Sequence, residues 1–168
     1  MPSLRKELTS FEQRWHSCRL IDGELNLRWC FYKFSEDESL RRGVRSAFSR
    51  WSEFFLLRWE EVLPSFRPDV IVQYALEEHI VKWNVIALAQ MPLVSHPYLP
   101  LRILVRPDID WEKFEPFKLF LHEVGHTLGA GHIKQKGCVM CPWYSSSGLD
   151  FTPEDVRELN GKLQPRRC

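Results

Sequence analysis

The segment around Glu123 carries three histidines at offsets that suit a metal ion, and it constrains the fold more than any other feature. On a helix, residues four positions apart lie one above the other, so His122 and His126 can direct their rings to one point. Glu123 lies beside that face, where it can hydrogen-bond a metal-bound water without being a ligand. Gly129 can end the helix with a positive φ and let the chain return His132 as a third ligand. Three protein ligands leave one tetrahedral position open, which is typical of catalytic zinc sites.

The pattern His-Glu-x-x-His-x-x-Gly-x-x-His resembles the signature of the metzincin zinc peptidases, which also carry a methionine turn beneath the metal. Met140 follows the motif, with Pro142 and Tyr144 behind it, and this spacing is similar to that of the matrixin branch. The resemblance implies that Met140 forms an apolar floor under one catalytic Zn²⁺ ion. It also implies that Pro142, Trp143 and Tyr144 shape the pocket for the substrate side chain just after the scissile bond.

Length, charge and hydropathy exclude several classes of protein. The chain has 168 residues, which suits one domain, and its formal net charge of +1 gives no reason to expect binding to nucleic acid or to an anionic membrane. No apolar stretch approaches the roughly 18 residues of a membrane span. Residues 1–7 lack the apolar run of a secretory signal. We therefore expect a cytoplasmic protein if this start is native, and an extracellular one if an export segment was removed.

Hydrophobic periodicity and turn residues predict alternating strands and helices. Strands are expected at residues 25–32, 69–75, 85–89 and 101–105, and more weakly at 59–62. Ser35 with Glu38 forms a capping-box pattern in front of an amphipathic helix that continues to about Leu57.

Three further helices are predicted. The first covers residues 4–15, and the second carries the zinc motif, with Pro116 in its first turn. The third begins at Thr152, an N-cap residue followed by proline and two acids. We expect the apolar face of the zinc-motif helix to pack against the sheet; its members are Phe117, Leu121, Val124 and Leu128.

Together with the resemblance, this order of elements predicts an α+β protein with the metzincin (zincin) fold. We expect a mixed, twisted sheet of about five strands packed on two long helices, with a C-terminal helix after the methionine turn. Residues 1–22 are predicted to be an N-terminal extension with helical structure. Residues 23–168 are predicted to be a matrixin-like catalytic domain. The family's calcium and structural-zinc segment has no clear counterpart here, so we expect neither ion.

The resemblance implies a zinc-dependent endopeptidase that hydrolyses peptide bonds through a metal-activated water. Glu123 would be the general base that takes the proton from this water and returns it to the leaving amine. The substrate would be a protein or peptide in extended conformation, paired by its backbone with the edge strand at Ala87 and Leu88. A monomer is expected.

Two other functions fit parts of the pattern. Cys138-Val139-Met140 resembles the corresponding segment of archaemetzincins, which would imply an intracellular metallopeptidase with aminopeptidase activity. The third hypothesis is a zinc-stabilised module that binds an extended peptide without cutting it, although such a module has no use for Glu123.

The cysteines leave further alternatives open. Cys138 and Cys141 can be two free thiols, form a disulfide with each other or with Cys168, or hold a second metal ion. Cys18 is, by its location, the candidate for the cysteine that keeps many matrixins latent, but it lacks the Pro-Arg-Cys-Gly context of that switch.

Overall fold

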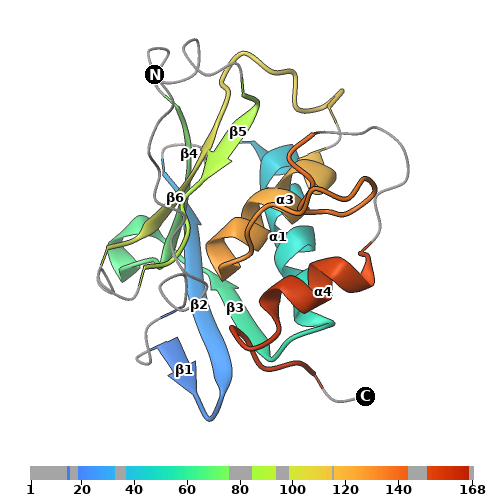
Figure 1. Ribbon diagram of the computed structural model, residues 1–168. Coiled ribbons are helices and arrows are strands. Elements are labelled where there is room, and N and C mark those ends of the chain that lie inside the picture. Colours follow the sequence, from blue (N-terminus) through green and yellow to red (C-terminus); the bar gives the residue numbers. More distant parts are fainter. Residues whose placement is uncertain are drawn as a thin grey trace, which may run out of the picture.

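The computed structural model describes residues 15, 19–32, 37–75, 85–93, 99–114, 116–143 and 151–166. In this part of the chain, a mixed sheet lies beside two long helices, and a shorter helix follows near the C-terminus (Figure 1). The arrangement confirms the predicted α+β fold class. None of the helices in the described ranges is both apolar enough and long enough to cross a membrane. Of the predicted N-terminal helix, only Trp15 belongs to the described residues.

Among the described residues the sheet has six strands, and their order across it is β1-β2-β4-β6-β5, with β3 paired to β2 beside this path. The strands are β1 (Leu20–Ile21), β2 (Glu24–Phe31), β3 (Leu57–Glu61), β4 (Val70–Tyr74), β5 (Ala87–Ala89) and β6 (Leu101–Val105). The β2, β3, β4 and β6 strands run parallel, while β1 and β5 are antiparallel to their neighbours. Within the described part of the sheet, β5 is therefore an edge strand.

The core lies between the sheet and the helix α1 (Glu38–Ser52). Apolar residues recur at helical spacing on the inner face of α1, and those at positions 40, 44, 47, 48 and 51 are fully buried. Trp29 of β2 stacks on Phe48 of this helix, with ring centroids 6.1 Å apart. Burial of such large aromatic surfaces is the dominant stabilising term in a core of this kind.

The predicted extension of this helix to about Leu57 is wrong, because α1 ends at Ser52. Leu57 instead begins β3, whose residues pair in parallel with residues 25–29 of β2. Phe55 fits the helical spacing of apolar residues, but it lies in the connection after α1. It is fully buried there, and its ring centroid lies 6.1 Å from that of Trp51.

The start of α1 also differs from the prediction. Its N-cap is Asp37, whose carboxylate accepts the backbone N–H of Leu40 at 3.0 Å, rather than Ser35. Asp37 and Ser35 are both good N-cap residues, so the sequence pattern alone did not decide between them. Ser35 lies outside the described residues.

The helix with the zinc motif is α3 (Pro116–Leu128), and it begins at proline as predicted. It lies alongside α1 (Figure 1), and its contacts with α1 are far more extensive than those with the sheet. The indole Nε1 of Trp51 on α1 donates to the carbonyl oxygen of Leu121 at 2.9 Å. The expectation that the apolar face of α3 packs against the sheet is therefore incomplete, because α3 contacts β5 and β6 but contacts α1 more extensively.

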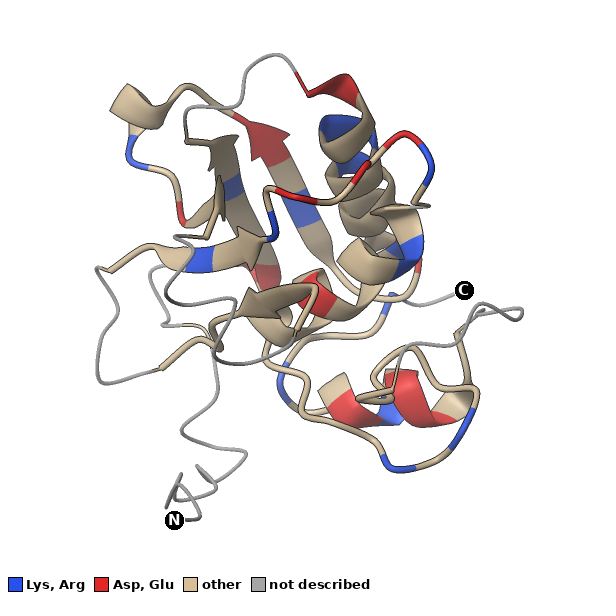
Figure 2. Cartoon of the chain, turned by 90° about the horizontal axis from the view of Figure 1, so that it is seen from above, with Lys and Arg blue, Asp and Glu red and all other residues tan. Residues whose placement is uncertain are grey.

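The last helix, α4 (Pro153–Leu159), has the predicted start: Thr152 caps it, and Asp155 completes a capping box. Between β3 and β4 lies one short 3₁₀ turn, η2 (Pro64–Phe66). Acidic and basic residues are interspersed over the described elements rather than gathered by sign (Figure 2). This distribution agrees with the near-zero net charge of the sequence.

Candidate metal centre and active site

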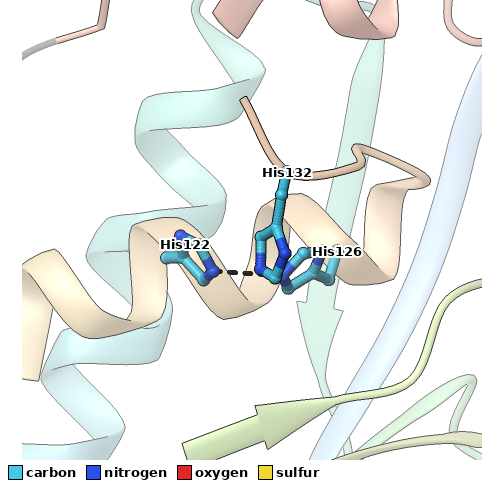
Figure 3. Close-up of side chains that lie close together, drawn as sticks. All are labelled: His122, His126 and His132. Carbon is cyan, nitrogen blue, oxygen red and sulfur yellow. Dashed lines mark hydrogen bonds between the residues drawn. The ribbon is translucent and has the colours of Figure 1, made fainter. Parts of the chain in front are cut away.

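The three histidines of the motif converge on one point beside α3 (Figure 3). The Nε2 atom of His126 lies 3.0 Å from that of His122 and 3.1 Å from that of His132. Nitrogens bound to one tetrahedral zinc at about 2.0–2.1 Å would be roughly 3.3 Å apart, so this spacing is close to that of a zinc site. Among the described residues, no other group of three histidines, cysteines or acids has such a geometry.

Hydrogen bonds to backbone carbonyls fix the tautomers of two of these rings. Nδ1 of His122 lies 2.8 Å from the carbonyl oxygen of Val139, and Nδ1 of His126 lies 2.8 Å from that of Ala130. Since a carbonyl can only accept, each Nδ1 carries the proton and each Nε2 presents a lone pair. Two lone pairs that face each other at 3.0 Å repel unless a cation lies between them. The donor set therefore fits a divalent metal such as zinc.

Burial keeps these imidazoles in the neutral form that binds metal. It lowers the pKa of His126 to about 3, with a further contribution from neighbouring His122. Burial is also the main reason why the pKa values of His122 and His132 lie below their usual range. Neutral rings that cannot easily take up protons are ready ligands, because protons compete with metal ions for the same lone pairs.

The turn after α3 brings His132 back toward the helix, as the sequence predicted. Gly129 adopts a φ of +108°, a conformation that favours glycine, and its N–H donates to the carbonyl oxygen of His126 at 3.0 Å. The N–H of Ala130 donates to Gly125 O at 2.9 Å. The chain then reverses, so that His132 approaches the two helical ligands from the other side (Figure 3).

Glu123 is the acid nearest to the histidines in sequence, and it lies buried with only 5 % of its surface exposed. Burial raises the pKa of its carboxyl group to about 8, and a hydrogen bond from the backbone of Ala89 on β5 opposes this shift. A carboxyl group with a pKa near neutrality can both accept and donate a proton. A cation held by the histidines would favour its ionised form.

Met140 lies beneath the motif, and a glycine of α3 makes room for it. A Cβ atom at Gly125 would lie 2.4 Å from the sulfur of Met140 and 2.9 Å from the ring of Trp51. Met140 is fully buried. Sequence reasoning missed the role of Gly125, although a glycine inside a helix was a visible signal of a close approach.

Asp155 is a second residue that sequence reasoning did not assign to the site. Its fully buried carboxylate accepts the backbone N–H groups of Val139 and Met140, each at 3.0 Å, and that of Thr152 at 2.9 Å. Because the carbonyl of Val139 accepts from His122, the carboxylate supports this ligand through one peptide unit. The sequence marked Asp155 as a helix-start residue and gave no sign that it reaches the methionine turn.

Four of the five expected substrate-binding residues belong to the part of the chain that the structure describes. Ala87 and Leu88 are half-buried on β5. Pro142 and Trp143 are exposed, with 66 % of Trp143 accessible, and Tyr144 lies outside the described residues. The contact between Ala89 and Glu123 shows that β5 reaches the site.

Cys138 and Cys141 are free thiols, so the disulfide between them is not formed. The sulfur of Cys138 lies 3.1 Å from the hydroxyl of Thr152. Cys18 and Cys168 lie outside the described residues, and the latency hypothesis stays a prediction.

Comparisons with known proteins agree with this geometry. The family model described as Matrixin matches residues 22–161. The chain is 25 % identical over 137 residues to the probable matrix metalloproteinase 095L of Invertebrate iridescent virus 3, covering 73 % of this chain and 37 % of that protein. It is 24 % identical over 127 residues to matrix metalloproteinase-C of Caenorhabditis elegans, covering 66 % and 21 %. With interstitial collagenase B of Mus musculus it is 25 % identical over 169 residues, covering 94 % and 35 %. The chain thus spans well under half the length of each of these relatives.

Proposed function

This chain belongs to the matrixin family, and from that premise we propose that it is a zinc-dependent endopeptidase. The observation that carries the proposal is the convergence of three imidazole nitrogens, with a buried glutamate next to His122 in the sequence. His122, His126 and His132 would hold the zinc ion. Three protein ligands leave a position for a reactant, which is the arrangement expected of a catalytic site.

Proton transfer is the task of Glu123 in this proposal. A zinc ion at the three histidines would supply a Lewis acid that makes a water molecule more acidic and polarises the scissile carbonyl. Glu123 takes one proton from the attacking water and then delivers it to the leaving amine nitrogen as the C–N bond breaks. Burial raises the pKa of this carboxyl group, and a zinc ion nearby would lower it again, so that the group could take up and release a proton near neutral pH. No covalent intermediate is required, so the cysteines need not act as nucleophiles.

Substrate binding would use the edge strand β5. This strand pairs with β6 on one side, at Ala87–Val105, Leu88–Leu104 and Ala89–Ile103, and an extended peptide could pair with its other side. Backbone pairing tolerates many sequences and allows cleavage within a chain. Pro142, Trp143 and Tyr144 would then select the side chain just after the scissile bond.

The variant Glu123→Gln tests the proposed base, because glutamine keeps the size of the side chain and cannot accept the proton. We expect it to bind zinc like the unsubstituted protein and to cleave internally quenched peptides at least about 100-fold more slowly. Retained cleavage would reject Glu123 as the base.

A chelator should abolish cleavage by the unsubstituted protein, and added zinc should restore it. Analysis of the products separates the alternatives. Internal cuts support the endopeptidase, stepwise release of N-terminal residues would indicate the archaemetzincin-like aminopeptidase, and binding without turnover would indicate the peptide-binding module.

A further inference from the structure

The ion pair of Glu158 and Lys162, at the end of α4 and just after it, is hydrogen-bonded to the loop that carries the third histidine. The Nζ of Lys162 donates to the carbonyl oxygen of Gly129 at 2.8 Å and to Oε1 of Glu158 at 3.0 Å. The same Oε1 atom accepts the backbone N–H of Gly131 at 2.9 Å. One cation and one anion therefore hold two peptide groups of the segment that joins His126 to His132.

This loop needs such partners because it has no regular secondary structure of its own. It follows the last turn of α3, where backbone carbonyls lose their helical partners. Its glycines allow the reversal but leave the backbone with more conformational freedom than other residues would. The absence of a side chain at Gly131 lets Glu158 approach, since a Cβ there would lie 3.2 Å from Oε1.

The environment of the pair makes its hydrogen bonds strong. The side chain of Lys162 is only 6 % exposed and that of Glu158 is 32 % exposed. Hydrogen bonds from or to ionised groups are about twice as strong as neutral ones, and burial limits their screening by solvent. In the neighbouring pair on α4, Glu154 is 30 % exposed, much like Glu158, but its partner Arg157 is 66 % exposed. Among the described residues, neither side chain of this pair is hydrogen-bonded to the loop.

We propose that Glu158 and Lys162 act as a clamp that positions His132 and thereby sets the affinity of the site for zinc. This inference rests on the proposed zinc site. The two residues touch neither metal nor substrate, so they are positioning residues that act through the backbone of the loop. Partners of this kind, which orient a ligand without binding the metal, typically change metal affinity 10–100-fold when removed. Lys162 also lies just beyond the residues that the matrixin family model matches, which end at Gly161.

The test compares zinc binding by four full-length proteins: the unsubstituted chain, Lys162→Met, Glu158→Gln and the matched control Glu154→Gln. Methionine keeps the length of the lysine stem and removes its donors. Zinc affinity is measured by competition with a chromophoric chelator, and the visible spectrum of the Co²⁺-loaded protein reports the geometry of the ligands. Urea unfolding of the metal-free proteins measures their stability separately.

We expect Lys162→Met to lower zinc affinity by about 10–100-fold and to change the cobalt spectrum. Glu158→Gln should have a smaller effect in the same direction, because its amide oxygen can still accept from the loop. The control should stay within about twofold in affinity, as exposed ion pairs contribute little.

Unchanged affinity and spectrum in both clamp variants would overturn the proposal. An equal loss in Glu154→Gln would also overturn it, because the effect would then come from α4 as a whole. If Lys162→Met does not fold, Glu158→Gln still decides the question. Failure of the unsubstituted chain to bind zinc would instead reject the proposed zinc site itself.

Discussion

On the metal side of the site, formed by α3, the methionine turn and α4, buried or partly buried hydrogen bonds tie each histidine-bearing segment to another segment. On the proposed substrate side, formed by β5 and residues 142–143, β5 is held by its pairing with β6, while residues 142–143 are exposed. The β5 strand has three half-buried residues, and Trp143 is largely exposed. Among the described residues, the proposed site therefore combines a hydrogen-bonded frame for the metal with a more exposed border.

This difference predicts two kinds of effect of substitutions, one on stability and metal binding and the other on substrate selectivity. A frame of buried carboxylates and packed glycines leaves little room for substitution, so changes there should affect stability and metal binding together. A border of exposed residues can change with little effect on folding, and it can therefore adapt to different substrates. Substitutions on each side should reveal whether stability and selectivity are separated in this way.

The largest expected effect is that of zinc itself. A metal that binds only the folded protein raises the free energy of unfolding by about 4 kcal/mol when its free concentration is about 1,000 times its Kd. Urea unfolding with zinc and with a chelator measures this difference. His126→Ala should lose most of it. Equal stability in both conditions would show that the metal side does not bind zinc.

The next effect is that of Asp155→Asn. An amide cannot accept all the hydrogen bonds that the carboxylate accepts from Val139, Met140 and Thr152, and its NH₂ group would face a buried N–H. We expect a loss of about 2–3 kcal/mol in the free energy of unfolding of the metal-free protein. The control is Glu154→Gln, which neutralises the neighbouring, partly exposed acid. Similar stability of the two variants would contradict the role of Asp155 as a frame residue.

A smaller loss is expected for Gly125→Ala. Alanine favours a helix by about 1 kcal/mol over glycine, but the new Cβ would lie 2.4 Å from the sulfur of Met140. Overpacking of this kind costs about 1–3 kcal/mol, so the net change should be destabilising. Combining it with Met140→Ala removes the clash with the sulfur and leaves only the close approach to the ring of Trp51, so the double variant should lose less than the sum of the two single losses. Additive losses would contradict the close packing.

The frame also shows where sequence reasoning succeeded. Spacing within one helix predicted that His122 and His126 share a face, and a glycine with positive φ predicted the return of His132. These are local properties that any chain with this pattern shares. The support from Asp155, Glu158 and Lys162 depends on how α4 packs against distant loops, and no local pattern records that contact.

The wrong prediction for the end of α1 also arose because tertiary contacts leave no local sequence pattern. Helical periodicity through Phe55 extended the predicted helix to Leu57, whereas pairing with β2 decided that Leu57 belongs to a strand. Periodicity identifies buried positions, and Phe55 is indeed buried. Whether a buried residue lies in a helix or in the turn behind it depends on tertiary contacts.

A further prediction concerns Trp15, which belongs to the predicted N-terminal extension. The indole Nε1 of Trp15 donates to the carbonyl oxygen of Thr127 at 2.8 Å, near the end of α3. Trp15→Phe keeps an aromatic ring and removes the donor, so the free energy of unfolding should fall by about 1 kcal/mol. Thermal unfolding measures the change. No loss would indicate that this hydrogen bond does not stabilise the metal side.

The smallest change in stability is expected for Trp143→Ala on the substrate side. The side chain is 66 % exposed, so its removal should alter the free energy of unfolding by no more than about 0.5 kcal/mol. If Trp143 borders the pocket, kcat/KM for peptides with a large side chain after the scissile bond should nevertheless fall by about tenfold. Leu63→Ala is the matched control, because Leu63 is 67 % exposed and is not one of the proposed site residues. It should change neither quantity. A loss of stability in Trp143→Ala, or unchanged selectivity, would mean that the two sides of the site are not separated as their contacts suggest.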